Sequence, residues 1–433
     1  MALSGVLLAA AALAATGGHG PGKAMPGKAT DGTILHGILR GKDNHTLLDL
    51  PFTVPAGVGK ITVDAMWEGR KQGTILVFGL SDPQRLRGWG GGNKSHFVVA
   101  GSFATPSYLP GPIQPGVWRL SLAVANIRPD VASPYTVKIS YGRGPAAQVV
   151  TDKPVREGAG WYRGDLHSHT AHSDGACRSL SGKAIPCPLF FTLKAAAEHQ
   201  LDFIVVTDHN ANSHVNDLAE LSPYFDTLLA IPGREITTQD GHYNLLGVAE
   251  PTAFVLGAKA TPTINALFDA SRATGALISI NHPEIPTGED CLGCGWNAPN
   301  TDYHRVQSIE VANGGIAADH DGAFDDGPKS GTAFWEALLN RGYHLTGVGG
   351  SDNHDAVDGH RGTSPVGAQS PVGTPTTVVY AEALSQPAIL AGIRSGRVFV
   401  DVEGAHPGRV LDLTARSGAA QAVMGGALAV ARG

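Results

Sequence analysis

Histidine and acidic side chains follow short apolar runs at five places along this chain of 433 residues. One histidine after an apolar run is usually ordinary polar surface, but five runs that each end in a histidine or a carboxylate are hard to attribute to chance. If the runs are parallel strands of one barrel, their carboxyl ends meet at one mouth and bring these side chains together. The five segments are residues 164–169, 207–210, 234–235, 281–284 and 350–354.

The spacing within two of these segments suits a metal ion. His167 and His169 are two residues apart, so on a strand both imidazoles point to one face and can bind one cation. Asp352 and His354 repeat this arrangement with a carboxylate. A carboxylate such as Glu235 can bridge two cations and offset their repulsion. Histidines clustered with a few carboxylates suit Zn²⁺, Mn²⁺ or Fe²⁺ better than Ca²⁺ or Mg²⁺, which prefer oxygen ligands.

Alternating strands and helices are expected to carry these segments from about residue 161 onward. The expected strands are continuous apolar runs, which is typical of parallel strands buried on both faces. We therefore predict an α/β region built from β/α units, with its chemistry at the C-terminal ends of the strands. The expected strands are residues 203–206, 228–233, 276–280, 308–311, 345–348, 376–380 and 398–400, and the expected helices are residues 190–199, 264–272, 332–340 and 386–395.

Short alternating runs separated by Gly, Pro and Asn turns fill residues 34–141, which is typical of an all-β sandwich. This region has no cluster of His, Cys or acidic residues, so we expect it to be a scaffold, a cover for the catalytic region or a substrate-binding module. The predicted organisation is a signal peptide at 1–14, a flexible leader at 15–30, the sandwich at 31–145, a linker at 146–160, the catalytic domain at 161–403 and a β extension at 404–433 with strand-like fragments at 410–413 and 428–430.

The first fifteen residues are small and apolar, and the Ala-Leu-Ala at 12–14 fits a signal-peptidase site with cleavage before Ala15. The run is too short to span a bilayer, which takes about 20 apolar residues. We therefore predict a periplasmic or secreted protein, with an ordinary N-terminal core helix as the alternative. No other segment is long and apolar enough to suggest a membrane span.

The composition indicates a globular chain. Hydrophobic residues make up 42% of it and charged residues 16%, too few charges for a disordered segment. The formal net charge is −6, and Lys and Arg form no run. We therefore expect no long nucleic acid as partner, although a few basic residues near a site could hold one phosphate.

The four cysteines are Cys177, Cys187, Cys291 and Cys294. In an exported protein an even number of cysteines predicts two disulfides, and the positions favour a local pair in each of two loops. The alternative is a zinc site at Cys291-x-x-Cys294, which has half of the usual spacing but lacks a second pair in the same loop.

Six ordered motifs resemble those of PHP (polymerase and histidinol phosphatase) domain metallohydrolases. The run DLHSHTAHSDG at 165–175 resembles the opening motif of that family, and VVTDHN at 205–210 resembles the second. The form of GHYNLLG looks most like the CehA/McbA-like branch, named for carbaryl hydrolases. The resemblance spans residues 161–402 and excludes the sandwich. The remaining matches are GREIT at 233–237, GHYNLLG at 241–247, INHPE at 280–284 and GSDNH at 350–354.

The resemblance implies a distorted seven-stranded (β/α) barrel that holds two or three divalent metal ions. It also implies that Asp165 and Asp208 orient histidine ligands instead of binding metal. Carried over residue by residue, it assigns the first ion to His167, His169, Glu235 and Asp352, the second to Glu235, His242 and His282, and the third to Asp174, His209 and His354.

A metal cluster of this kind supplies its own nucleophile. A water that bridges two cations loses a proton near neutral pH and attacks as hydroxide, while the cations polarise the oxygen under attack. The sequence has no GxSxG elbow and no P-loop. His214, His304 and His360 are candidates for protonating the leaving group, and Arg361 for holding a substrate phosphate. His172 lies within the first motif and is interpreted as a neighbour of the site.

The leading functional hypothesis is an exported phosphoesterase that hydrolyses a small phosphodiester or phosphomonoester. The second is a carbamate or carboxyl ester hydrolase that uses the same metal site. The third is a non-catalytic glycan- or polymer-binding protein with an inert barrel. The complete set of expected ligands argues against this third hypothesis, because degenerate barrels usually lose ligands. The sequence makes no prediction of oligomeric state.

Overall fold

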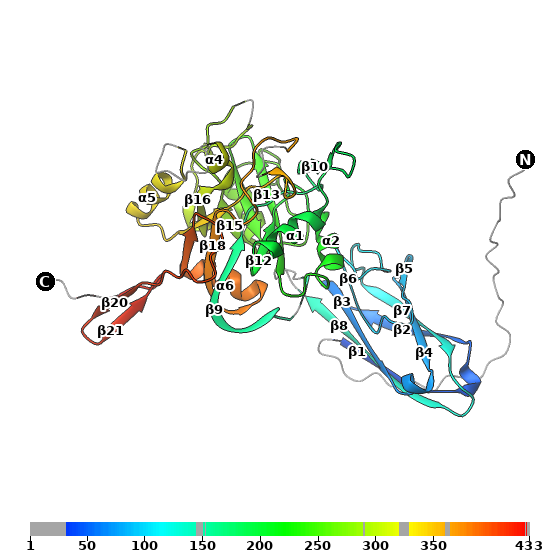
Figure 1. Cartoon of the computed structure of the whole chain (residues 1–433). Helices are drawn as coiled ribbons and strands as arrows, with labels where there is room; N and C mark the ends of the chain where they lie inside the picture. The colour runs from blue at the N-terminus through cyan, green and yellow to red at the C-terminus, as the bar shows by residue number, and fades with distance from the viewer. Residues whose placement is uncertain are drawn as a thin grey trace, which may run out of the picture.

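An all-β region precedes a mixed α/β region in the computed structural model (Figure 1). The structure describes residues 32–143, 150–151, 153–288, 291–319, 329–359, 364–428 and 430. The predicted signal peptide and leader, as well as the candidates His360 and Arg361, lie outside the described residues. Among the described residues, no helix has the length and apolar character needed to cross a membrane.

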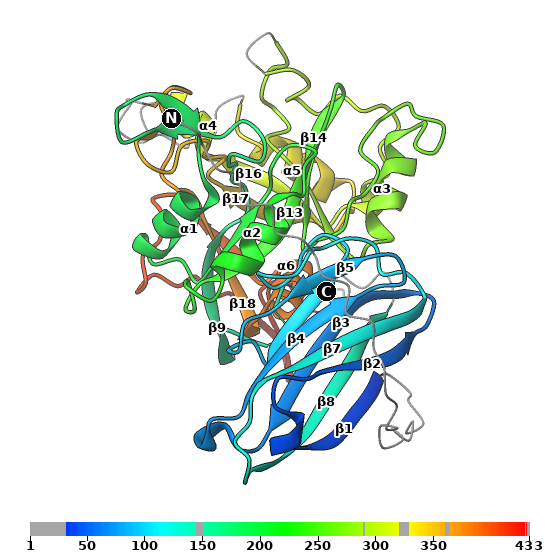
Figure 2. The ribbon, with the colours of Figure 1, turned by 90° about the vertical axis from the view of Figure 1, so that its right-hand side faces the viewer.

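The N-terminal region is the predicted β-sandwich, with two four-stranded antiparallel sheets in the orders β1-β8-β3-β6 and β2-β7-β4-β5. Alternation along β7 buries every second side chain from Trp118 to Val124, because successive side chains of a strand point to opposite faces. These side chains meet those of β3 and β8 in one apolar core. Figure 2 shows the ribbon of the strands that carry them. The strands are β1 (Gly32–Arg40), β2 (Leu47–Val54), β3 (Val58–Trp67), β4 (Ile75–Ser81), β5 (Leu86–Trp89), β6 (His96–Ala100), β7 (Gly116–Asn126) and β8 (Ala132–Arg143).

The second region contains a nine-stranded sheet in the order β17-β16-β15-β14-β13-β12-β9-β18-β19. All seven predicted strands are present, each within a few residues of its expected start. The sheet's strands are β9 (Arg156–Asp165), β12 (Phe203–Val206), β13 (Leu229–Thr238), β14 (Gly241–Leu246), β15 (Leu277–Ile280), β16 (Ser308–Asn313), β17 (Thr346–Gly350), β18 (Thr376–Leu384) and β19 (Val398–Asp401).

The sheet curves until its ends approach each other. Just beyond β9 and β17, Ser168 pairs with Asn353 in a parallel bridge, and the amide of Asp352 donates to the carbonyl of His167 at 2.9 Å. Gly349 also exchanges hydrogen bonds with the Thr377 hydroxyl of β18. The sheet is therefore nearly closed and resembles a barrel whose mouth lies at the ends of β9 and β17.

This sheet differs from the predicted seven-stranded barrel of parallel units in two ways. It has nine strands, and β14, β18 and β19 run antiparallel to their neighbours. Two residues separate β13 from β14, and a link that short permits only an antiparallel hairpin. Strand β9 begins at Arg156, inside the predicted linker 146–160, so the catalytic domain begins earlier than expected.

Helices cover the sheet and bury apolar strands on both faces, which explains why all four residues of β12 are buried. All four predicted helices are present. Ser385 caps the last of them by accepting a hydrogen bond from Ala388, and Gly396 ends it in a left-handed conformation. The helices are α1 (Leu189–Glu198), α2 (His214–Leu221), α3 (Ile264–Arg272), α4 (Gly314–Asp319), α5 (Thr332–Asn340) and α6 (Gln386–Ser395), with 3-10 turns η1 (Gly41–Asp43), η2 (Arg70–Gln72) and η3 (Tyr303–Arg305).

The C-terminal extension is a hairpin of β20 (Thr414–Ser417) and β21 (Ala420–Val423), which projects away from the sheet in Figure 1. The predicted fragment at 410–413 was wrong, because the first strand begins at Thr414, and the fragment at 428–430 lies partly outside the described residues. A second small hairpin, β10 (Ala176–Arg178) with β11 (Ala184–Pro186), follows the first motif.

The sandwich contacts the α/β region beside α2. Phe103 is buried against Val215 of α2 and Ala249, and Ser102 donates a hydrogen bond to Glu250 at 3.0 Å. Asn212, which lies between His209 and α2, donates to the Ser102 hydroxyl at 3.2 Å. The loop after β6 therefore supports the segment that follows the second motif.

Candidate metal centre

The mouth of the barrel gathers the predicted ligands, but not all of them lie at the end of a strand. Glu235 lies within β13, His242 is the second residue of β14, and Asp174 lies in the loop between β9 and β10. His209 pairs with Glu235 of β13 through a parallel bridge, which continues the β12–β13 register. His282 and Asp352 have backbone φ angles of 27° and 51°, in the left-handed region that non-glycine residues rarely adopt. Such strain persists only where the surroundings enforce it, which is characteristic of functional sites.

Glu235 is the centre of the cluster. Its Oε1 lies 3.5 Å from His167 Nε2, 3.3 Å from His242 Nδ1 and 3.4 Å from His282 Nε2. Its Oε2 lies 3.5 Å from His169 Nε2 and 2.7 Å from His209 Nδ1. Three imidazole nitrogens therefore lie within 3.5 Å of Oε1, and two lie within 3.5 Å of Oε2. This is the arrangement expected of a carboxylate that bridges two cations.

Asp352 adds a second carboxylate to the same centre. Its Oδ1 lies 3.2 Å from His167 Nε2 and 3.1 Å from His169 Nε2. The donor atoms of His167, His169 and Glu235 lie within 4.8 Å of one another, and so do those of His167, His282 and Asp352. The four residues predicted for the first ion are therefore close enough to share one.

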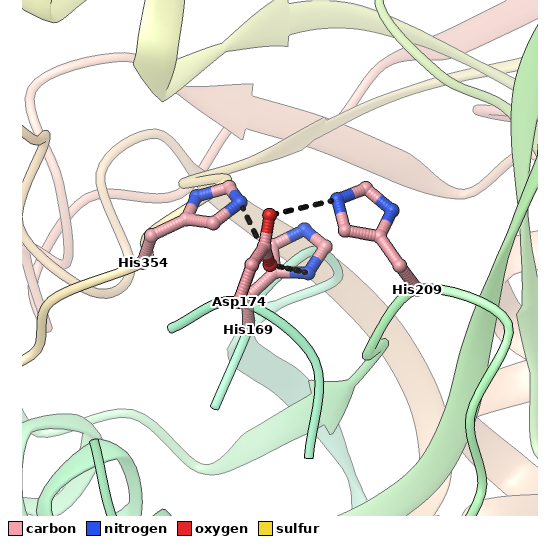
Figure 3. A group of neighbouring side chains, drawn as sticks. All are labelled: His169, Asp174, His209 and His354. Atoms are coloured by element: carbon pink, nitrogen blue, oxygen red, sulfur yellow. Dashed lines mark ion pairs between the residues drawn. The ribbon is translucent and has the colours of Figure 1, made fainter. Parts of the chain in front are cut away.

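A third, more open group surrounds Asp174 (Figure 3). Its carboxylate lies between three rings, 3.6 Å from His209 Nε2, 3.5 Å from His354 Nε2 and 3.9 Å from His169 Nδ1. Its side chain is 58% exposed, whereas Glu235 is fully buried. The structure thus brings together the three residues predicted for the third ion and places His169 between this group and the first.

Hydrogen bonds orient the rings so that a lone pair of each faces the carboxylates. The Nδ1–H of His167 donates to Glu310 at 3.0 Å, which leaves Nε2 toward Glu235. The Nε2–H of His242 donates to the carbonyl of Leu292 at 3.0 Å, which leaves Nδ1 toward Glu235. The Nδ1–H of His354 donates to its own chain at the carbonyl of residue 352, at 2.9 Å. Fixing a ring through its distal nitrogen is how proteins prepare histidines for metal binding.

Several buried polar atoms of the cluster have no hydrogen-bond partner. They include His167 Nε2, His169 Nδ1 and His242 Nδ1, all inaccessible to solvent. Leaving such atoms unpaired costs about 1–3 kcal/mol each, so proteins rarely do so without a ligand to satisfy them. A divalent cation would accept these lone pairs, and the residues therefore fit a metal.

The electrostatics of the cluster favour positive charge at its centre. Burial opposes the charged forms, yet carboxylates led by Asp352 raise the pKa of His167 above its ordinary value. Burial is likewise outweighed at His209, where Glu235 raises the pKa to about 9. Neighbouring histidines outweigh burial and hold the pKa of Glu235 well below its usual range. His169 moves the other way, because burial and two neighbouring histidines lower its pKa to about 4.

A pocket of about 420 Å³ opens onto this cluster. Cys291, Leu292 and Cys294 form part of its wall, and no Lys or Arg of the described residues lines it. Thr237 contributes a hydroxyl group to the wall, and its Oγ1 lies 2.6 Å from His209 Nδ1. An anionic substrate would therefore meet imidazoles, carboxylates and their cations instead of basic side chains.

Glu310 is a functional residue that the sequence analysis missed. It lies on β16, accepts hydrogen bonds from His167 and from the backbone of His282, and also binds Asn313, which in turn contacts Asp352 at 3.2 Å. The signal was present, since a carboxylate interrupts an apolar strand that is buried on both faces. A buried carboxylate is rare unless it is paired.

Asp165 and Asp208, predicted to orient histidine ligands, form their hydrogen bonds with the segments that carry those ligands and not with the imidazole rings of the ligands. Asp165 accepts backbone N–H bonds from His167, Ser351 and Gly373 at 3.1, 2.9 and 2.7 Å, so it ties β9 to the segment after β17. Asp208 anchors the turn before Asp174 by accepting from the amide and hydroxyl of Thr170 and from the hydroxyl of Ser173. Both aspartates position the backbone that carries the ligands.

The predicted substrate contacts fare differently. His214 is fully buried at the start of α2, 3.2 Å from Asp208, so it cannot touch a substrate in the pocket, and that prediction was wrong. His304 lies on η3, before β16 begins and thus at the opposite end of the strands, where its ring packs on Tyr343. It too is wrong. His172 contacts Ser213 and Asp217 at 2.8 and 3.0 Å, outside the pocket wall.

The cysteines form the two predicted local pairs, Cys177–Cys187 and Cys291–Cys294. Cys177 belongs to β10, and its partner follows β11, so the first pair closes the small hairpin after the first motif. The second closes a loop of the pocket wall. In the described residues no cysteine is free.

The sequence matches no protein-family model, and it matches no curated protein. Among solved structures, part of the chain is similar to a two-domain protein of Bacteroides vulgatus that contains a predicted PHP-like metal-dependent phosphoesterase, with 21% identity and a TM-score of 0.37. That match covers 57% of this chain and 66% of the other, just under two thirds. A protein of Bifidobacterium adolescentis, provisionally named a metal-dependent phosphoesterase, matches at 13% identity and a TM-score of 0.29, over 44% of this chain and 87% of its own. Similarity at this level carries no functional argument, which must come from the site.

Proposed function

We propose that this chain is an exported, metal-dependent phosphoesterase of the PHP type that hydrolyses a small phosphodiester or phosphomonoester. The observation that carries the proposal is the convergence of five histidines on the carboxylate of Glu235, each within 3.5 Å. The two disulfides support export, since disulfides persist in oxidising compartments.

The chain offers ligands for two or three ions of Mn²⁺, Zn²⁺ or Fe²⁺. Ions in such a site lower the pKa of a water molecule and polarise the ester oxygen under attack. The ligands would be His167, His169, Glu235 and Asp352 for the first ion, Glu235, His242 and His282 for the second, and Asp174, His209 and His354 for the third.

The protein's own groups prepare this chemistry. Glu235 joins the first two ligand sets, and Glu310 keeps the lone pair of His167 turned inward. Asp174 marks the solvent side, where a substrate can enter. The described wall offers no serine, its two cysteines are paired and its threonine contacts His209, so water is the nucleophile that the site supports.

The pocket favours a small, anionic substrate. Its volume of about 420 Å³ is in the range of sites for small molecules. Two-metal sites recur in phosphatases and nucleases, because two cations clamp both the attacking and the leaving oxygens of a phosphoryl group. With no basic side chain in the described wall, the cations would provide the counter-charge for the phosphate.

A carbamate or carboxyl ester hydrolase is the second candidate. Leu292 is 75% exposed at the edge of the pocket and offers an apolar contact for an aryl leaving group. This hypothesis keeps the metal site and changes the substrate. A non-catalytic binding protein is disfavoured, because all nine predicted metal ligands are present and gathered at one mouth.

Parallel assays of the metal-stripped chain, with Mn²⁺ or Zn²⁺ added back, separate these functions. The substrates are bis(p-nitrophenyl) phosphate, p-nitrophenyl phosphate and a naphthyl carbamate. We expect phosphate-ester turnover that requires the added metal and disappears in Glu235→Gln, whereas Glu336→Gln on the exposed face of α5 keeps it. Carbamate turnover without phosphate-ester turnover would refute the first choice. Absence of bound metal and of all activity would favour the binding protein.

A further inference from the structure

Cys294 lies beside the ligands of the second ion. Its side chain is 1% exposed, and its sulfur lies within 4.8 Å of a nitrogen of both His242 and His282. Those two rings also approach Oε1 of Glu235, at 3.3 and 3.4 Å. A sulfur donor is therefore close to a set of two imidazoles and one carboxylate, which by itself offers three protein ligands.

The disulfide with Cys291 keeps this sulfur from acting as a ligand, since a thiolate, not a disulfide, binds metal. The same closed loop orients His242, because the carbonyl of Leu292, between the two cysteines, accepts its Nε2–H at 3.0 Å. The pair thus lies in direct contact with a predicted ligand. It also lines the open pocket, where a small dithiol can reach it.

The position of Cys294 does not depend on the disulfide alone. Gly293 packs so tightly on the β13–β14 hairpin that an added Cβ would lie 2.1 Å from the carbonyl of Thr238. After the loop, the amide of Trp296 donates to Pro283 at 2.9 Å and that of Asn297 to Asp240 at 2.8 Å. These contacts would hold residue 294 beside the rings after the disulfide opens.

We propose that Cys294 is a redox-gated fourth ligand of the ion held by Glu235, His242 and His282. A small dithiol gives two electrons and two protons to the disulfide, so the S–S bond breaks, both cysteines become thiols and the reagent closes to its own cyclic disulfide. Cys294 then releases its thiol proton to water and donates a sulfur lone pair to the ion. A thiolate ligand shifts the preference of this site toward Zn²⁺ and away from Mn²⁺.

Cobalt spectroscopy tests the proposal on the full chain. Metal-stripped protein is reduced with dithiothreitol, freed of reagent under argon and loaded with Co²⁺, beside an unreduced sample. A near-ultraviolet sulfur-to-cobalt charge-transfer band reports a thiolate ligand, and visible bands report cobalt bound by other ligands. The readout does not depend on catalysis, so this proposal rests on the metal site of the proposed function but not on its substrate.

Cys291→Ser and Cys294→Ser are matched variants, because each abolishes the same disulfide and they differ in the sulfur that remains. We expect the charge-transfer band in reduced wild type and in Cys291→Ser without reduction. We expect no such band in Cys294→Ser or in unreduced wild type. Zn²⁺ should also protect Cys294 of Cys291→Ser from alkylation. The proposal is overturned if reduced wild type and Cys291→Ser bind cobalt without the band, if unreduced wild type shows it, or if no form binds cobalt. Dithiothreitol also opens Cys177–Cys187, so the band is assigned to Cys294 only if reduced Cys294→Ser lacks it, and unreduced Cys291→Ser provides the same test with that other pair closed.

Discussion

Replacing Glu310 by glutamine would test how the site prepares its first ion. The carboxylate accepts three hydrogen bonds, from the ring of His167 at 3.0 Å, the amide of His282 at 2.9 Å and the side chain of Asn313 at 3.0 Å. Glutamine has the same shape but has one acceptor oxygen and one NH₂ group. If the amide oxygen replaces Oε2 and keeps the hydrogen bonds from His282 and Asn313, the NH₂ group faces the Nδ1–H of His167, and two donors meet.

The two donors no longer oppose each other if the His167 ring changes tautomer. His167 Nδ1 becomes the acceptor, and Nε2, which faces Glu235 and Asp352, takes the proton and loses the lone pair that binds metal. Losing an outer hydrogen-bond partner of a metal-binding histidine typically costs about 10- to 100-fold in metal affinity. This corresponds to about 1.4–2.7 kcal/mol. We expect Glu310→Gln to weaken the zinc affinity of the first site about 10- to 100-fold.

The assay is competition of Zn²⁺ between the stripped protein and a chromophoric chelator, with bound metal counted independently. Glu336→Gln makes the same chemical change on the exposed face of α5 and should bind zinc like wild type. Thermal unfolding establishes that both variants are folded. Unchanged zinc affinity in folded Glu310→Gln would refute the tautomer argument.

Three further predictions concern packing and protonation. Gly350→Ala should lose about 1–3 kcal/mol of unfolding free energy and weaken zinc binding, because its Cβ would lie 2.4 Å from that of His167, whereas Gly160→Ala meets nothing within 4 Å and should be neutral in both measurements. The affinity of the third group for Co²⁺ should rise with pH until about 9 and then level, since His209 is protonated below its raised pKa and must release that proton to bind; a flat pH profile would contradict this. Phe103→Ala should lower the free energy of denaturant unfolding by about 3–5 kcal/mol and weaken the Co²⁺ affinity of the third group, because the ring supports α2 behind His209. Phe97→Ala inside the sandwich should lower stability without changing the Co²⁺ affinity.

Local patterns were enough to predict most of the strands and helices. The apolar run 203–206 is β12, fully buried as predicted, and the helices at 332–340 and 386–395 have the predicted bounds. Alternation in β7 predicted a sandwich strand. These features depend on side-chain periodicity and capping, which a sequence displays directly.

Strand direction and the partners of each side chain were not predictable in the same way. The antiparallel β18 and β19 look like any other apolar run, and helix α2 was missed because its sequence is largely polar. His214 and His304 resembled loop histidines, yet one is buried against Asp208 and the other lies at the far end of β16. Direction and depth come from long-range pairing, which leaves no periodic signal.

The sequence by itself indicated which side chains could share a cation, because residue type and a spacing of two positions place the imidazoles of His167 and His169 on one face of a strand and repeat this with Asp352 and His354. Only the tertiary structure decided that Glu310 turns His167 inward and that the loop closed by Cys291 and Cys294 contacts His242. These contacts join residues far apart in the chain, His167 and Glu310 being 143 positions apart. Their geometry exists only once the sheet has curved toward closure.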